Sequence, residues 1–347
     1  MKTFSVLWIG IAIWAFSSIG YAAMQKQFVY ELQVKYSGKG QMTISTSGYF
    51  NIDIEIDSQE RGESLIIRNI RGTKGITQPY TINVYAPSNK FALVNVNLGN
   101  ISFGTLNIDC HDIGTIRTHS CELNLKSDTQ KRINYVYARP GIKSFIAPQA
   151  KVTFLSAFEY IGDPEFAVSV SNEFPRISIS ALKFGTIRMR KLKKYRYDNW
   201  ISQVAAQKIG KVIGSAVSHI FSENHIKFIK TYNVSGLIMS GTIFSNQTVY
   251  YQKGNVKIIR AGAIFDCYIL AGVPPLLIDN GVYYDVIPAN GKVKSIRAES
   301  TQNTQIVSAR RVRFGWLSDR PTFGTETIVW ENQKARKLKL HNIKKKN

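Results

Sequence analysis

The chain has 347 residues, of which 44% are hydrophobic, and a formal net charge of +22. This apolar content excludes a chain that is disordered throughout, and the length allows two domains or one large β architecture. The charge is concentrated in the second half, because residues 23–150 hold 14 Lys and Arg against 10 Asp and Glu, whereas residues 151–347 hold 30 against 13. A positive field of this size attracts polyanions and repels cationic partners.

The first 23 residues have the pattern of an export signal. Lys2 precedes a nearly unbroken apolar run over residues 4–19, and Gly20 and Ala22 stand at the positions that a signal peptidase reads. We therefore predict a signal peptide at residues 1–23 and an exported protein that is periplasmic, displayed on the cell surface or secreted. An uncleaved membrane anchor is the alternative, because about 20 apolar residues can span a bilayer.

Residues 24–190 read as a β-rich domain. Apolar and polar residues alternate over residues 30–36 and again over residues 50–56, which is the period of half-buried strands. Further short apolar segments are separated by Gly, Asn, Pro and Ser, at intervals typical of a sandwich or barrel. The predicted fold class is mainly β, with one or two antiparallel β-sandwich-like domains.

The three cysteines fit an exported protein. Ten residues, one of them a glycine, lie between Cys110 and Cys121. We predict that these two cysteines form a disulfide, which would persist outside the cytosol. Cys267 lies in an apolar run and is expected to be a buried free thiol. The chain has no Cys-x-x-Cys pair, so neither a zinc ribbon nor a redox motif is present.

Residues 191–232 join a basic segment to an amphipathic pattern. Apolar residues from Ile201 to Ile220 recur at helical spacing, with polar residues on the opposite side, and Asp198 or Asn199 can cap a first turn. We predict a single amphipathic helix at about residues 199–222, between the β-rich parts. Gly210 and Gly214 within it each lower the intrinsic helix preference by about 1 kcal/mol relative to Ala.

Residues 233–331 read as a hairpin-rich β domain, and residues 332–347 as a basic mobile tail. Asn280-Gly281 and Asn290-Gly291 have the chemistry of type I′ hairpin turns. A short internal echo joins VYY at residues 249–251 and VKIIRA at 256–261 to VYY at 282–284 and VKSIRA at 293–298. Two copies are fewer than the three that a solenoid usually needs, so either a duplicated hairpin or shared strand chemistry explains the echo.

The densest cluster of cations and tyrosines is the candidate binding site. Guanidinium groups bind phosphate, sulfate or carboxylate, and aromatic rings stack on sugar faces. The chain has no Gly-x-Ser-x-Gly, Walker or dinucleotide-binding motif, and we predict no catalytic residue, metal or cofactor. The predicted anionic-ligand site consists of Arg188, Arg190, Lys191, Lys193, Lys194, Tyr195, Arg196 and Tyr197.

These features predict an exported bacterial adhesin or surface-structure component. Its expected ligand is an anionic polysaccharide, lipopolysaccharide or a host cell surface, with protein partners in a surface assembly as a further option. Nucleic acid and membrane association are less favoured partners. The alternatives in function are a secreted toxin or hydrolase on a β scaffold, and a periplasmic assembly factor for a pilus or secretion system.

Overall fold

The chain divides into two compact units, residues 1–150 and residues 151–347. Every helix or strand in the described part of the chain is a β-strand, so the prediction of a mainly-β fold is confirmed. The computed structural model describes residues 31–37, 41–47, 52–55, 64–69, 80–86, 93–98, 104–110, 113–118, 121–130, 132–163, 177–189, 199–245, 248–273, 289–317, 322–323, 327–331 and 334–337.

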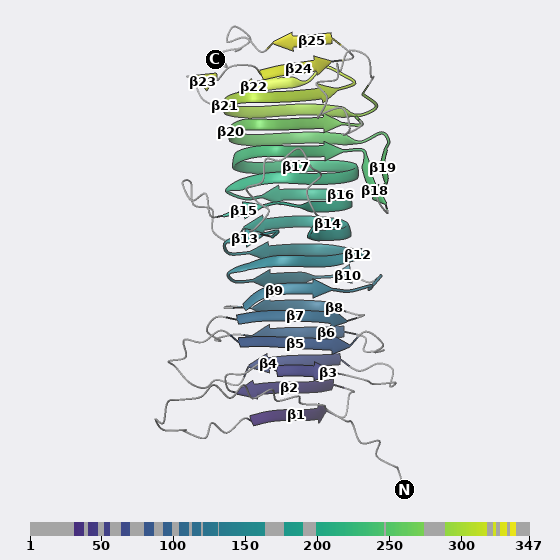
Figure 1. Ribbon diagram of the computed structural model, residues 1–347, viewed down its shortest axis with the longest axis vertical. Helices are drawn as coiled ribbons and strands as arrows, with labels where there is room; N and C mark the ends of the chain where they lie inside the picture. Colours follow the sequence, from purple (N-terminus) through teal and green to yellow (C-terminus); the bar gives the residue numbers. More distant parts are fainter. Residues whose placement is uncertain are drawn as a thin grey trace, which may run out of the picture. The chain divides into compact units, whose positions relative to one another are not determined.

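The strands of the first unit form two parallel stacks (Figure 1). From β2 to β7 each strand pairs in parallel with the strand two places along, and β8 and β9 then pair in parallel with β11 and β12. The two stacks are therefore β2–β4–β6–β8–β11 and β3–β5–β7–β9–β12, while β1 pairs with β2 in antiparallel fashion. The strands are β1 (Glu31–Ser37), β2 (Gln41–Ser47), β3 (Ile52–Glu55), β4 (Ser64–Asn69), β5 (Tyr80–Ala86), β6 (Leu93–Leu98), β7 (Gly104–Cys110), β8 (Ile113–Thr118), β9 (Cys121–Lys126), β10 (Arg132–Ile133), β11 (Tyr135–Ala138) and β12 (Gly141–Ala157), which ends in the second unit.

Alternating side chains explain this stacking. In β7, Leu106 and Ile108 are buried, and in the paired strand β9 the register places Leu123 and Leu125 directly beside them. The residues between these apolar positions, Asn107 and Asn124, face outward. Their side chains pair across the strands, where Asn124 Nδ2 donates a hydrogen bond of 3.0 Å to Asn107 Oδ1. Each coil therefore buries one row of apolar side chains on the row of the next coil, as in a β-solenoid.

The register of β7 and β9 bears on the predicted Cys110–Cys121 disulfide. Cys121 begins β9 and lies opposite Gly104, the first residue of β7, whereas Cys110 ends β7. The length of β7 between these positions is about 20 Å, whereas the Cα atoms of a disulfide lie about 4.4–6.8 Å apart. The structure describes the backbone of both cysteines but neither side chain, so the bridge stays a prediction, and it would need a different register.

The second unit is also built from coils whose strands pair in parallel (Figure 1). The chain of pairings runs β14–β16–β17–β20–β21 and continues from β21 to β22, β23 and β24, while β18–β19 and β24–β25 are antiparallel. Its strands are the end of β12, β13 (Tyr160–Ile161), β14 (Ile179–Met189), β15 (Trp200–Ile201), β16 (Val204–Ile213), β17 (Ala216–Ser240), β18 (Thr242–Ser245), β19 (Thr248–Tyr251), β20 (Asn255–Ala271), β21 (Lys292–Ser308), β22 (Arg313–Trp316), β23 (Thr322–Phe323), β24 (Thr327–Glu331) and β25 (Lys334–Lys337).

Each long strand of the second unit contains three paired runs joined by corners. The first runs are residues 225–230 in β17, 255–260 in β20 and 292–297 in β21. The second runs are 233–234, 263–264 and 300–301, and the third runs are 236–239, 267–270 and 304–307. Each run of β17 pairs with its counterpart in β20, which pairs with its counterpart in β21. The corner between the second and third runs recurs in successive coils and uses the left-handed backbone region. Across these coils, the corner residues with positive φ are Gln203 (58°), His219 (46°), Gly236 (64°), Asp266 (44°) and Asn303 (40°).

Glycines allow close backbone contact at the corner that precedes the first run. Gly254 stands just before β20 and Gly291 just before β21, and Gly254 O accepts a hydrogen bond of 3.2 Å from Lys292 N. A Cβ atom on Gly254 would overlap the backbone of Gly241, and one on Gly291 would overlap the carbonyl oxygen of Gly254. The coils can approach each other here only because side chains are absent.

The predicted helix at about residues 199–222 is wrong, because these residues form β15, β16 and the start of β17. Within this segment, the buried residues Ile209 and Val212 of β16 are three apart. An interval of three residues also occurs between apolar residues on one face of an amphipathic helix, where they recur at i, i+3, i+4 and i+7. The spacing therefore favoured a helix over a strand, whose period is 2. The two glycines of this segment serve close packing, since a Cβ on Gly210 would overlap the carbonyl oxygen of Gly185 in the neighbouring strand β14.

The predicted antiparallel arrangement is also wrong for the long strands, which pair in parallel. Asn290-Gly291 leads into β21, which is parallel to β20, so it forms no hairpin between them. Asn280-Gly281 lies outside the described residues, as does the predicted signal peptide. The predicted mobile tail contains a described strand, β25, paired with β24. Among the described residues there is no helix with the length and hydropathy needed to cross a bilayer.

Candidate anion-binding face

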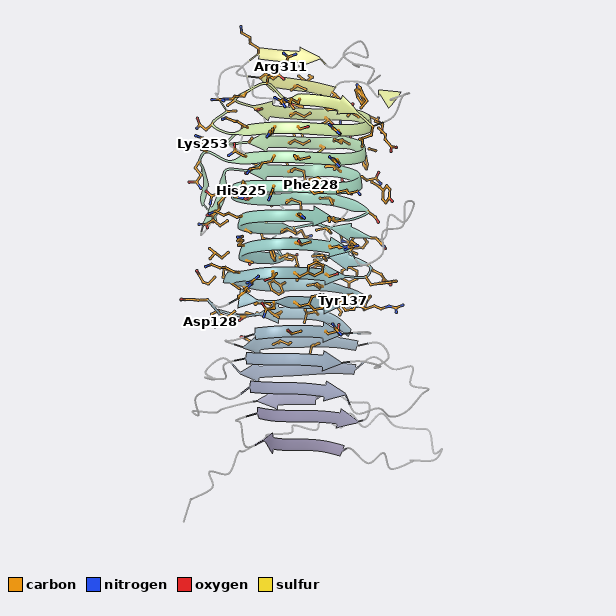
Figure 2. All side chains as sticks on the ribbon, turned by 180° about the vertical axis from the view of Figure 1, so that it is seen from behind. Asp128, Tyr137, His225, Phe228, Lys253 and Arg311 are labelled. Atoms are coloured by element: carbon orange, nitrogen blue, oxygen red, sulfur yellow. The ribbon has the colours of Figure 1, made fainter. Side chains whose placement is uncertain are left out.

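The first runs of successive coils in the second unit form one surface, here named the basic face. It comprises residues 183–188 of β14, 208–213 of β16, 225–230 of β17, 255–260 of β20, 292–297 of β21 and 313–315 of β22, which the register places side by side. In β17, Ile226 and Ile229 point into the core, and Lys227 and Lys230 are exposed. Figure 2 labels His225 and Phe228 on this strand.

Lysine and arginine dominate the face. Their positions are Lys183, Arg188, Lys208, Lys211, Lys227, Lys230, Lys257, Arg260, Lys292, Lys294, Arg297 and Arg313, and these six ranges of the sequence contain no Asp or Glu. All of them are exposed except Lys292, which is half-buried. Glu223 and Glu299 flank the face from the adjacent corners.

Stacking places like charges beside each other. Lys230, Arg260 and Arg297 are direct register partners in β17, β20 and β21, and Lys183 is the partner of Lys208. Neighbouring strands lie about 4.8 Å apart, so each column brings cationic side chains within one strand spacing. Like charges at directly opposed positions destabilise a sheet.

A second column arises from Lys227, Lys257 and Lys294. Each of these lysines directly follows an inward-pointing residue. Those residues, Ile226, Val256 and Val293, are register partners of one another. In the first unit, by contrast, a pair of stacked residues carries opposite charges. Lys126 is the register partner of Asp109, and its Nζ atom lies 3.2 Å from Asp109 Oδ2. The like-charge columns are therefore not a general consequence of the coil architecture.

The titration of His225 reflects the field of these lysines. Burial lowers the pKa of His225, and the positive charges of Lys257, Lys208, Lys183 and Lys227 lower it further. The imidazole is therefore neutral at neutral pH, although an isolated histidine would be partly protonated. His225 marks the end of the face at which these four lysines act together.

Phe228 holds one of the arginines in place. The ring is half-buried in the middle of the face, and the guanidinium carbon of Arg260 lies 5.8 Å from its centroid. A cation–π contact of this kind contributes about 0.5–1 kcal/mol at an exposed site and restricts the arginine side chain. The guanidinium keeps its N–H donors available for a carboxylate or sulfate.

Only one residue of the predicted binding site is described by the structure. Arg188 is exposed in β14 and belongs to the basic face, where Ile213 separates it from Lys230 in the same column. The rest of the predicted site stays a prediction, because its residues lie outside the described part of the chain: Arg190, Lys191, Lys193, Lys194, Tyr195, Arg196 and Tyr197. The remaining cations of the face were not part of the predicted site.

A buried polar cluster occupies the left-handed corner of the second unit. Ser218 Oγ donates a hydrogen bond of 3.0 Å to Ser202 Oγ, which lies 3.4 Å from His219 Nδ1. Burial lowers the pKa of His219, so its imidazole is neutral at neutral pH. Ser202 has no exposed surface, and its hydroxyl is therefore out of reach of a substrate. In the described residues no group of three or more His, Cys, Asp or Glu is placed to hold a metal ion.

No protein-family model, curated protein or solved structure matches the chain. The function is therefore inferred from the residues of the basic face. Exposed lysines and arginines at regular spacing, with no carboxylates among them, can bind the repeated acidic groups of a polyanion.

Proposed function

We propose that this protein is an exported bacterial surface component, of the adhesin type, that binds an anionic polysaccharide through the basic face of its second unit. The observation that carries the proposal is the column of Lys230, Arg260 and Arg297, whose like charges stack on consecutive strands. Such a column lowers the stability of the free protein. A bound polyanion removes the repulsion and replaces it with attraction.

The size of the face favours a polymer over a small anion. Five strands from β14 to β21 each contribute at least two cations, so a ligand with many acidic groups can use all of them at once. The predicted export signal places the protein where acidic polysaccharides, lipopolysaccharide and host glycans occur. A nucleic acid is less favoured, because the runs in β16, β20 and β21 contain no aromatic side chain on which bases could stack.

The test compares two triple variants on immobilised heparin and on immobilised polygalacturonate. Lys230→Gln, Arg260→Gln and Arg297→Gln together remove one column of the face. A matched control variant removes the same charge from exposed positions outside the strands. At about 0.5–1 kcal/mol for each exposed ion pair, the column variant should bind roughly 10- to 150-fold more weakly.

The control carries Lys253→Gln, Arg310→Gln and Arg311→Gln, which are exposed and lie outside the strands (Figure 2 labels Lys253 and Arg311). It should elute at nearly the same salt concentration as the wild-type protein. Equal losses in the two variants would show that only net charge matters, and retention of the column variant at wild-type salt would exclude the face as the binding site. Thermal unfolding of both variants checks that they fold.

A further inference from the structure

We infer that the bound polymer runs along the stack of coils, across the strands, and that it needs an unbroken series of cationic coils. This inference rests on the proposed function and adds the direction and the chain length of the ligand. It follows from the spacing of the cations in the two possible directions on the face.

Cations are closer together across the strands than along them. Within β17, Lys227 and Lys230 are three residues apart, which corresponds to about 10 Å of extended strand. From Lys230 to its register partner Arg260 the separation is one strand spacing, about 4.8 Å. Over β17, β20 and β21 the charge density met by a ligand is therefore about twice as high along a column as along a strand.

The face is also longer and straighter in this direction. A path along β17 leaves the face after residue 230, because the chain then turns through a corner into residues 233–234. A path across the strands passes from β14 through β16, β17, β20 and β21 to β22, which is about 24 Å for five strand spacings. A linear glycan with an acidic group on every sugar, or on every second one, suits this ladder.

The experiment removes the same charge from the middle or from one end of the ladder. Lys227→Gln with Lys230→Gln neutralises β17 and leaves two cationic strands on one side and three on the other. Lys183→Gln with Arg188→Gln neutralises β14 and leaves five consecutive cationic strands. Both variants lose two exposed cations, so a ligand that senses only the general field would respond to them equally.

Affinities are measured by calorimetry for a galacturonate trimer and for long polygalacturonate chains. For the long chains, the middle variant should lose about tenfold in affinity and the end variant less than about threefold. For the trimer, the two variants should differ by less than about twofold, because the three cationic strands β20, β21 and β22 stay intact in both. The charge-preserving variant Lys227→Arg with Lys230→Arg should bind the long chains with wild-type affinity.

The outcomes separate this inference from the proposed function. Equal weakening of the long chains by the middle and end variants would overturn the direction along the stack and leave the binding face intact. A wild-type protein that binds neither glycan would overturn the proposed function itself. A long chain that binds no better than the trimer would also contradict the need for an unbroken ladder.

Discussion

The like-charge column predicts that the protein becomes more stable when part of its basic face is removed. The change is Lys230→Gln with Arg297→Gln, which eliminates both repulsions on Arg260 while keeping the contact of Arg260 with Phe228. Two unit charges one strand spacing apart repel by about 0.9 kcal/mol in water, and physiological salt reduces this to about half. The two repulsions together should therefore add about 1 kcal/mol to the free energy of unfolding.

Thermal and denaturant unfolding measure this gain, which corresponds to about 2–4 °C in Tm for a unit of this size. The control Lys253→Gln with Arg311→Gln removes the same net charge from exposed positions outside the strands, and should change stability by less than about 0.5 kcal/mol. At 1 M salt the gain should mostly disappear, since the Debye length falls to about 3 Å. A double variant that is no more stable than the control at low salt would refute the reasoning.

Two further predictions concern the coils themselves. Gly254→Ala should destabilise the second unit by more than about 2 kcal/mol, because its Cβ would overlap the backbone of the adjacent coil. Gly315→Ala should be nearly neutral, because its Cβ would only contact a side-chain atom at 3.7 Å, and similar losses at both sites would contradict the described stacking. Thiol titration of the unfolded protein without reductant should find three free thiols, from Cys110, Cys121 and Cys267, if the register of β7 and β9 is right. A single thiol would instead support the predicted disulfide and require a different register.

The sequence allowed the fold class to be predicted but not the direction of the strands. Alternation of apolar and polar residues indicates strands whatever their pairing, and the turn chemistry of Asn290-Gly291 favoured hairpins. The echo between residues 256–261 and 293–298 was the main sign of stacked coils, and the register shows the two segments side by side. The third copy, residues 226–231, was not recognised, because its sequence IKFIKT shares only the spacing of the apolar and basic residues.

The excess of positive charge in the second half could be predicted, but its arrangement could not. Lys230, Arg260 and Arg297 are 30 and 37 residues apart in the sequence, and only the stacking of coils makes them neighbours. Basic residues that follow one another, from Arg188 onward, are easier to see as a cluster than cations that recur once in a coil. A search for repeats of Lys-x-x-Lys or Lys-x-x-Arg flanked by apolar residues would have found the column.

The pKa of His225, followed by NMR with and without polygalacturonate, reports on the face without any mutation. Burial and four lysines hold this pKa below its usual range in the free protein, so acidic groups bound along the face should raise it. His219 is an internal control, because burial alone lowers its pKa at a separate corner. A rise at His225 with no change at His219 is the expected result. Saturating polymer that leaves His225 unchanged would contradict binding at the basic face.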